Sequence, residues 1–166
     1  MARLTEAVVD LFMDAFEDDF GTKVTALNDY YADEVELKDV LTTKDGPPRL
    51  VDGRNYPALF VWGTAMSNDV EQPLSQFNAN HSIRLAVAVS GQEMSTLYRQ
   101  LYRYGDVILQ VVDEITKGSD ESFAIGGDIE VEYQEAPYEA TGAVVLQVIV
   151  TVQVEHAESL VVPEVP

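Results

Sequence analysis

Hydrophobic and polar residues alternate most regularly between Asn80 and Gly118, where the pattern predicts a strand followed by a long helix. The residues predicted to face inward are Ile83, Leu85, Val87 and Val89 in the strand and Met94, Leu97, Leu101, Tyr104, Ile108, Val111 and Ile115 in the helix. Ser90 and Glu93 have the spacing of a capping box, and Lys117 before Gly118 is typical of a helix end. The block predicts a strand beside a helix that packs on it, and it contains no catalytic group.

The N-terminal third of the chain is predicted to be mainly helical. Residues 3–20 have the pattern of an amphipathic helix that ends at Gly21, and residues 24–31 predict a second, shorter helix. The inward stripe of the first helix comprises Leu4, Val8, Leu11, Phe12, Ala15 and Phe16. Residues 42–55 contain Gly and Pro in a polar setting and are predicted to form a loop.

Three further strands are predicted. Residues 56–62 form a strand candidate that Pro57 confines to a sheet edge or to its own first positions, and residues 63–79 follow as a polar loop. Residues 118–127 are predicted to be a loop rich in glycine and acids. The last two strand candidates are residues 128–134, with Ile129, Val131 and Tyr133 inward, and residues 142–155.

The order of these elements is helix, helix, strand, strand, helix, strand, strand. It predicts an α+β fold in which an antiparallel or mixed sheet of about four strands packs against a long helix and an N-terminal helix. We expect a single domain over residues 1–156, since 166 residues with 46% hydrophobic content suffice for one core. Residues 157–166 are predicted to be an acidic, extended tail.

Acidic residues dominate the charge of the chain, whose formal net charge is -19. Such a chain is repelled by nucleic-acid phosphates and by anionic membranes, so binding to either through charge neutralisation is not expected. Two interpretations of the acid excess are open: solubility at ordinary salt, or a high-salt source in which repulsion is screened. Glu6, Asp10, Asp14 and Asp18 favour the second, because they form a row of like charges along one helix face.

Side chains able to catalyse a reaction or bind a metal are few. The chain has no cysteine, which excludes thiol chemistry and disulfides, and its two histidines, His81 and His156, lie near the ends of different strands. Asp120, Glu121 and Asp128 do not follow the spacing of a calcium-binding loop. We therefore expect no catalytic residue, no metal and no cofactor.

Tyrosines and arginines on the long helix are candidates for a subunit contact, because these residue types are favoured at protein interfaces. Two arginines of the loop at residues 42–55 are separate candidates for an intersubunit ion pair with the acidic first helix. The candidate interface residues are Arg49, Arg54, Tyr98, Arg99, Tyr102 and Arg103. The alternative is that the tyrosines extend the core while the arginines reach solvent, and that the loop containing Arg49 and Arg54 is simply solvated. Gly105, within the same helix, either allows another backbone to approach or marks a kink.

Taken together, several segments resemble the tail-terminator, or tail-completion, proteins of long-tailed viruses. The segments that carry the resemblance are the N-terminal helix, residues 54–63, residues 86–91, residues 97–106 and the final valine-rich strand. The resemblance covers most of residues 3–155 and is one of order and pattern, since this group has no invariant motif. It implies an α+β protein without enzymatic activity, and it transfers no functional residue to this sequence.

The resemblance also implies an assembly. Such proteins form a homo-oligomeric ring, typically a hexamer, that joins the tail tube to the neck or head-completion protein of a virion assembled in the host cytoplasm. Genomic DNA passes through the ring without specific binding, and no membrane is involved; an acidic lumen would suit this passage. The acid excess suggests a halophilic host. The alternatives are another neck or connector protein of the same particle, or a monomeric α+β binding module or small enzyme of a halophile.

Overall fold

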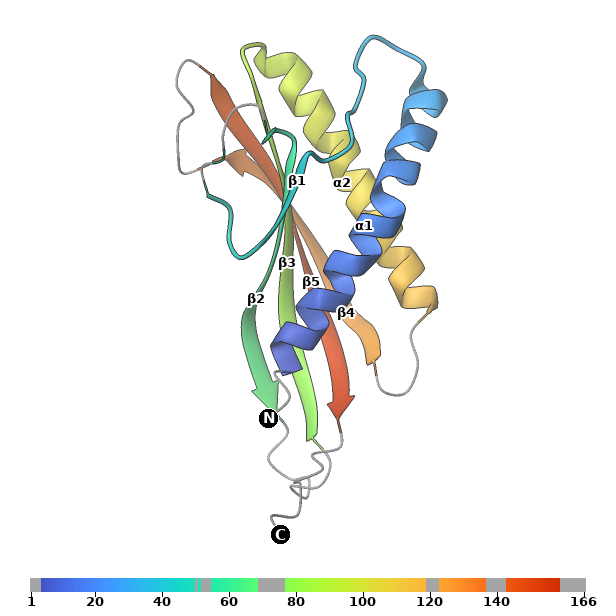
Figure 1. The fold of residues 1–166 in the computed structure, drawn as a ribbon, viewed down its shortest axis with the longest axis vertical. Coiled ribbons are helices and arrows are strands. Elements are labelled where there is room, and N and C mark those ends of the chain that lie inside the picture. Colours follow the sequence, from blue (N-terminus) through green and yellow to red (C-terminus); the bar gives the residue numbers. More distant parts are fainter. Residues whose placement is uncertain are drawn as a thin grey trace.

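The computed structural model describes residues 4–49, 51, 55–68, 77–118, 123–136 and 143–158. The elements in chain order are α1 (Leu4–Tyr31), β1 (Thr42–Asp45), β2 (Ala58–Asn68), β3 (Phe77–Gly91), α2 (Met94–Lys117), β4 (Phe123–Glu135) and β5 (Val144–Glu158). Figure 1 shows long strands behind two helices that cross them at an angle. The protein has an α+β fold, as the sequence pattern predicts, with two helices packed on a mixed, mostly antiparallel sheet.

The sheet has five strands in the order β1-β2-β3-β5-β4. Only the β1–β2 pair is parallel, while β3 pairs with β2 on one side and β5 on the other in antiparallel fashion. β4 forms the other edge of the sheet and is antiparallel to β5, with an irregularity between Gly126 and Glu130. The two hairpin-like regions on either side of α2 therefore meet through β3 and β5 at the centre of the sheet.

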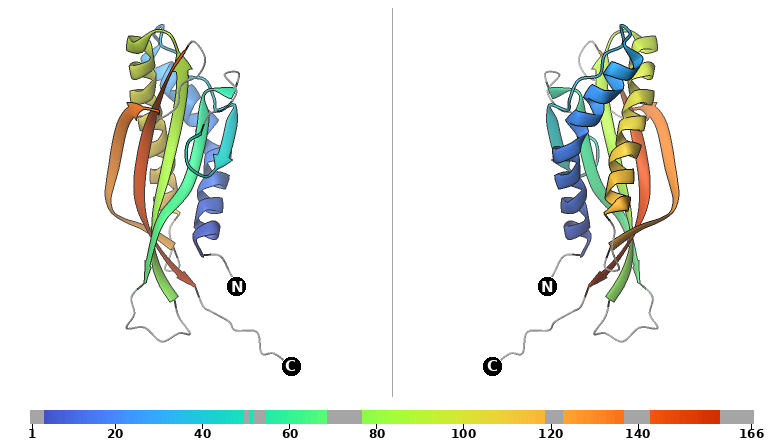
Figure 2. Two further views of the ribbon diagram at one scale, coloured as in Figure 1. Left: turned by 90° about the vertical axis from the view of Figure 1, so that its left-hand side faces the viewer. Right: turned by 90° about the vertical axis from the view of Figure 1, so that its right-hand side faces the viewer.

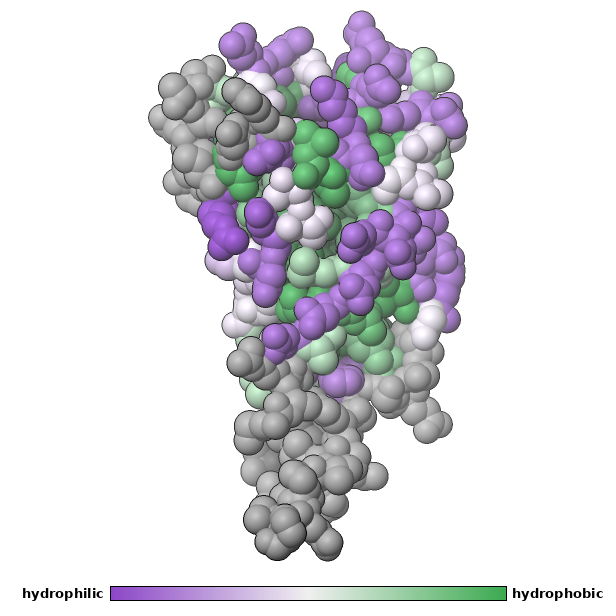
Figure 3. Space-filling model, in the orientation of Figure 1, coloured by the Kyte–Doolittle hydropathy of each residue, from purple (hydrophilic) through white to green (hydrophobic). Residues whose placement is uncertain are grey.

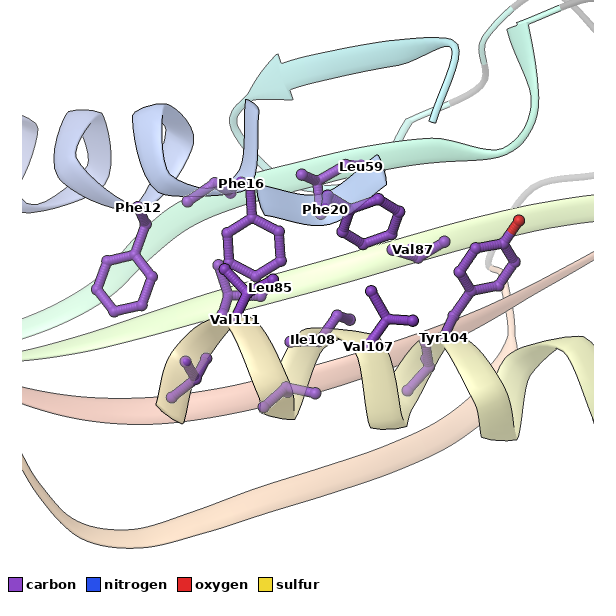
Figure 4. Close-up of a cluster of buried hydrophobic side chains, with 14 of the residues drawn as sticks. Phe12, Phe16, Phe20, Leu59, Leu85, Val87, Tyr104, Val107, Ile108 and Val111 are labelled. Atoms are coloured by element: carbon purple, nitrogen blue, oxygen red, sulfur yellow. The ribbon is translucent and has the colours of Figure 1, made fainter. Parts of the chain in front are cut away.

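Both helices pack on the same face of the sheet, which the side views of Figure 2 show as a separate layer. Side chains of α1 and α2 interdigitate there with every second residue of β2, β3 and β5. The largest fully buried side chains in this layer include Phe12, Phe16, Phe20, Leu85, Tyr104 and Ile108, several of which are drawn in Figure 4. Because each buried side chain of this size contributes roughly 1.5–3 kcal/mol, this layer is the main source of stability.

The opposite face of the sheet has a second, smaller apolar cluster. Its buried members are Tyr56, Ala58, Phe60, Ala86, Ala88, Val145 and Ile149. Val51, from the connection between β1 and β2, and Ala136, just beyond β4, pack against this cluster and are partly buried. We call this side the helix-free face, because α1 and α2 contribute no residue to its cluster.

The predicted break at Gly21 is wrong, since α1 is one helix of 28 residues. A Cβ at position 21 would lie 2.7 Å from an Asp39 carboxylate oxygen. Gly21 therefore makes room for the segment that returns along α1, while its backbone remains helical. A glycine that terminates a helix and one that permits a close approach look the same in the sequence.

Four predicted bounds of loops and of the tail are also corrected. β1 lies within the predicted loop 42–55, β2 extends to Asn68 within the predicted loop 63–79, and β4 begins at Phe123. Of the two alternatives for Pro57, the edge is wrong because β2 has neighbours on both sides, whereas a place at the start of the strand fits, since β2 begins at Ala58. β5 continues to Glu158, beyond the predicted start of the tail, and residues 159–166 lie outside the described residues.

The capping box predicted at Ser90 and Glu93 is wrong as well. Ser90 belongs to β3, where it lies opposite Val145 of β5, and Glu93 is the N-cap of α2. The Glu93 carboxylate accepts a hydrogen bond from the Ser95 hydroxyl at 3.0 Å. Pairing with β5 thus keeps Ser90 in the sheet.

Candidate functional site

Arg103 lies inside the molecule and not on the outer face predicted for it. Its guanidinium donates hydrogen bonds to both carboxylate oxygens of Asp33, at 2.9 and 2.5 Å, and also to the Val35 carbonyl. The Tyr31 ring covers the guanidinium at 4.0 Å. Arg103 is 7% exposed, so we remove it from the candidate subunit contacts and assign it a role in holding the chain after α1 against α2.

The charges of this ion pair stabilise each other. The hydrogen bonds from Arg103 hold the pKa of Asp33 below its usual value, and the same hydrogen bonds raise the pKa of Arg103. A bidentate contact of this kind fixes orientation as well as distance. The ion pair therefore holds the chain that follows the C-terminal end of α1 against α2.

Two further side chains hold the segment between α1 and β1 through its backbone. Asn28 donates to the Leu37 carbonyl and accepts from the Leu37 amide, both at 2.9 Å. The Tyr104 hydroxyl donates to the Lys38 carbonyl at 2.7 Å and accepts from the Lys38 amide at 3.1 Å. Burial raises the pKa of Tyr104. These side chains satisfy backbone N–H and C=O groups of the extended segment that a neighbouring strand would satisfy in a sheet.

Tyr98 and Tyr102 lie where α2 meets the β4 edge, together with Tyr133 of β4. The ring centroids of Tyr102 and Tyr133 are 5.0 Å apart in an edge-to-face arrangement, and those of Tyr98 and Tyr102 are 6.2 Å apart. Tyr102 is 51% exposed and Tyr133 is 40% exposed, although partial burial still raises the pKa of Tyr133. We call Tyr98, Tyr102 and Tyr133 the aromatic flank.

Gly105 explains how the aromatic flank fits together. A Cβ at this position would lie 2.9 Å from the Tyr133 hydroxyl oxygen. The glycine therefore accommodates a side chain of the same protein, whereas the sequence suggested the backbone of another element or a kink. Tyr133 was predicted to face inward, but the structure places it at the margin of the helix layer.

The other candidate arginines are separated in the fold. Arg99 is exposed on α2, near enough to Asp33 to help lower the pKa of that carboxyl. Arg49 is exposed after β1, where its guanidinium lies near Gly46, at the opposite side of the sheet from β4. Arg54 lies outside the described residues. The structure thus gathers the tyrosines but does not bring Arg49 to them.

The two histidines are brought together, which the sequence left open. Their ring centroids are 6.2 Å apart, and Nδ1 of the fully buried His81 lies 3.3 Å from the Thr5 hydroxyl. Burial, followed by the nearby His156, lowers the pKa of His81. Within the described residues, His81 Nε2 and His156 Nδ1 have no hydrogen-bond partner.

Among the described residues, no group of three or more His, Asp or Glu side chains is placed to hold a metal ion. Asp128 is exposed at the irregularity of β4, and Asp120 and Glu121 lie outside the described residues. A cleft of about 690 Å³ between α1 and β1 is lined by Asp10, Asp14, Glu17 and Asp39, with Met13 and Leu41 beside them.

The outer surface of α1 is strongly acidic. Glu6, Asp10, Asp14 and Asp18 are all exposed, as the predicted row of like charges requires. Figure 3 shows hydrophilic side chains following α1 diagonally across this side of the molecule. In the part of the chain that the structure describes, no helix is both long and apolar enough to cross a membrane.

The helix-free face contains polar groups that the sequence analysis did not single out. Gln147 is 2% exposed and Thr151 is 7% exposed. Gln147 Oε1, Thr151 Oγ1 and Arg84 Nε have no hydrogen-bond partner within the described residues. Alternation along a single strand assigns residues to one face or the other, but it does not indicate whether the second face is buried.

No protein-family model matches this chain, and no curated protein matches it.

Proposed function

We propose that this chain is a structural subunit of a homo-oligomeric ring that caps the tail tube of a long-tailed virus and joins it to the neck. The proposal rests on the resemblance in the order and texture of the elements, which the α+β arrangement fits. The observation that carries the step to assembly is the aromatic flank: three tyrosines gathered beside an open sheet edge, two of them substantially exposed. Tyrosine supplies much of the contact area at protein interfaces.

The surface charge supports the same proposal. An acidic surface along α1 would repel DNA that passes the ring, so the genome would slide without adhering to the protein. The partners are then further copies of the chain, the tail-tube protein and a neck or head-completion protein. The site of action is the virion, and the acid excess points to a halophilic host.

Light scattering coupled to size-exclusion chromatography, together with electron microscopy, tests the ring. We expect a closed ring with a central opening, and we expect it to be more stable to heat in multimolar salt than in low salt, because salt screens the acidic repulsion. A strict monomer in both salts would overturn the ring. Equal melting temperatures in both salts would overturn the halophilic origin but leave the ring intact.

A second candidate is a monomeric binding module, which the cleft between α1 and β1 favours. Its volume of about 690 Å³ is within the range of small-molecule sites. Four carboxylates on its lining would select a cationic ligand. A monomer that binds organic cations with loss of affinity in Asp14→Asn would favour this candidate over the ring.

A further inference from the structure

The sheet ends in two strands, β1 and β4, that each have a single neighbour within the described residues. An edge strand presents unpaired backbone N–H and C=O groups that can add a strand from another chain. β4 has 13 residues and is mostly exposed, whereas β1 has four residues. The protein therefore offers two surfaces for sheet extension, on opposite sides of the same sheet.

The two edges have opposite charges on the same face. Lys44 of β1 lies opposite Phe60 of β2, whose side chain is on the helix-free face. Glu132 of β4 lies opposite Ile149 of β5, whose side chain is also on the helix-free face. Glu130 is two residues before Glu132 in the same strand and therefore shares that face. The helix-free face thus has a cation at its β1 edge and exposed carboxylates at its β4 edge.

Strand directions allow the two edges to meet. β1 is parallel to β2, and the pairs β2–β3, β3–β5 and β5–β4 are all antiparallel. Following these pairings across the sheet, β1 and β4 run in opposite directions. A second copy in the same orientation therefore brings its β1 antiparallel to β4 of the first copy, which is the commoner kind of pairing.

Charge also disfavours the competing contacts. Pairing of β4 with β4 would place Glu130 and Glu132 among carboxylates of the same kind, and like charges opposite each other destabilise a strand pair. Pairing of β4 with β1 places Lys44 among them instead. The favoured contact joins two different surfaces, and contacts of that kind close into rings when the rotation per subunit permits.

We propose that β4 of one copy pairs antiparallel with β1 of the next copy, so that one sheet continues around the ring. Lys44, with Arg49 just beyond β1, faces Glu130 and Glu132 of the neighbour on the helix-free face. On the helix side, the aromatic flank reaches the cleft between the neighbour's α1 and β1, where Leu41 is 59% exposed. This inference rests on the proposed ring and specifies the surfaces that form it.

Disulfide trapping tests the contact directly, because the chain has no cysteine of its own. We expect the double variant Lys44→Cys/Glu132→Cys to form, on mild oxidation, a ladder of covalent multimers that ends at the ring. Within one copy the two edges are four strand spacings apart, about 19 Å, which is too far for a disulfide. Each single-cysteine variant should remain monomeric in covalent terms, because the proposed contact brings Lys44 to Glu132 and neither residue to the same residue of another copy. Lys117→Cys/Glu132→Cys is the matched control that should give no ladder.

Charge reversal provides the second test, at the lowest salt concentration in which the wild-type ring persists. Lys44→Glu and Glu132→Lys should each shift the protein from ring to smaller species at a given concentration. The double variant Lys44→Glu/Glu132→Lys should restore the ring, because it exchanges the charges without removing the pair. Lys117→Glu changes the net charge as Lys44→Glu does, but it lies on α2 and should leave the ring unchanged.

The outcomes separate this contact from the proposed function. A wild-type ring that gives no ladder with Lys44→Cys/Glu132→Cys and tolerates both single reversals would overturn the sheet contact and leave the ring standing. A wild-type chain that is monomeric in low and multimolar salt would overturn both. A ladder together with rescue by the double reversal would establish the contact.

Discussion

The two faces of the sheet differ in the size and polarity of their buried side chains. The helix-covered face is filled by large side chains, among them Phe12, Phe16 and Phe20 of α1. The helix-free face has three alanines, Ala58, Ala86 and Ala88, in its apolar cluster, next to buried polar groups such as Gln147 and Thr151. Large apolar side chains fill the space between two layers, whereas alanines leave a flatter surface.

We infer from this difference that the helix-covered face stabilises the fold, whereas the helix-free face takes part in contacts with other copies of the chain. The helix-covered face buries most of the apolar area, and its ends are held by specific polar contacts such as those of Tyr104 and Arg103. The helix-free face has polar atoms without partners in the described residues, and its two edges have opposite charges. We therefore expect mutations on the first face to unfold the protein and mutations on the second to affect its assembly.

The largest expected effect is from Phe16→Ala, which removes a ring that is 1% exposed between α1 and the sheet. We expect the free energy of unfolding to fall by about 3–5 kcal/mol, because the cavity cannot collapse completely. Chemical denaturation measures this. Leu11→Ala on the same helix is the control and should cost far less, because Leu11 is 39% exposed. A small effect of Phe16→Ala would contradict the assignment of stability to the helix-covered face.

Tyr104→Phe should have the next largest effect. It keeps the buried ring and removes both hydrogen bonds to the Lys38 backbone, so we expect a loss of about 1–3 kcal/mol. Tyr98→Phe, which changes a partly buried tyrosine of the same helix, is the control. Equal stability of wild type and Tyr104→Phe would show that water satisfies Lys38 equally well.

The Asp33–Arg103 pair predicts a smaller, pH-dependent effect. The pKa of Asp33 is below its ordinary value of 3.8 in the folded protein, so its contribution to stability is complete above pH 3.8 and is lost as the pH falls through the folded pKa. Asp33→Asn should therefore be less stable than wild type at neutral pH, and the two should converge in strong acid. Denaturation at several pH values checks this; a constant difference across that range would refute it.

Thr151→Val should change stability least, by less than about 1 kcal/mol in either direction. The Thr151 hydroxyl oxygen is buried without a partner in the described residues, so replacing it with a methyl group removes no hydrogen bond seen there. Thr116→Val is the contrasting variant, because the Thr116 hydroxyl donates to the Val112 carbonyl at 2.9 Å. A large loss of stability in Thr151→Val would mean that the helix-free face contributes to stability more than the comparison allows.

The alternation in β3 and the helical spacing in α2 were enough to predict these two elements from the sequence. The inward faces of β3 and α2 are confirmed, apart from Met94, which is 37% exposed. The end of α2 at Lys117 is confirmed as well. These elements combine strong periodicity with clear flanking residues, so long-range contacts had little left to decide.

Long-range contacts account for the elements and sites that were mispredicted. β1 has four residues, Thr-Thr-Lys-Asp, with no apolar alternation, and it is a strand because β2 pairs with it. Arg103 has the pattern of an arginine that reaches solvent, but the chain after α1 places Asp33 and the Val35 carbonyl against it. The partner of the candidate tyrosines, Tyr133, is about thirty residues away in the sequence and meets them only through the order of strands.

The sequence alone determined the fold class, most of the helix-covered core and the acidic surface, since these follow from periodicity and composition within each segment. Leu11 is an exception in the predicted inward stripe of the first helix, because it is 39% exposed. Tertiary structure decided that α1 continues through Gly21, that Arg103 is buried and that Lys44 and Glu132 are on one face at opposite edges of the sheet. Each of these depends on which segment packs beside which. Residues far apart in the sequence interact only once the sheet has formed, so no local pattern can encode them.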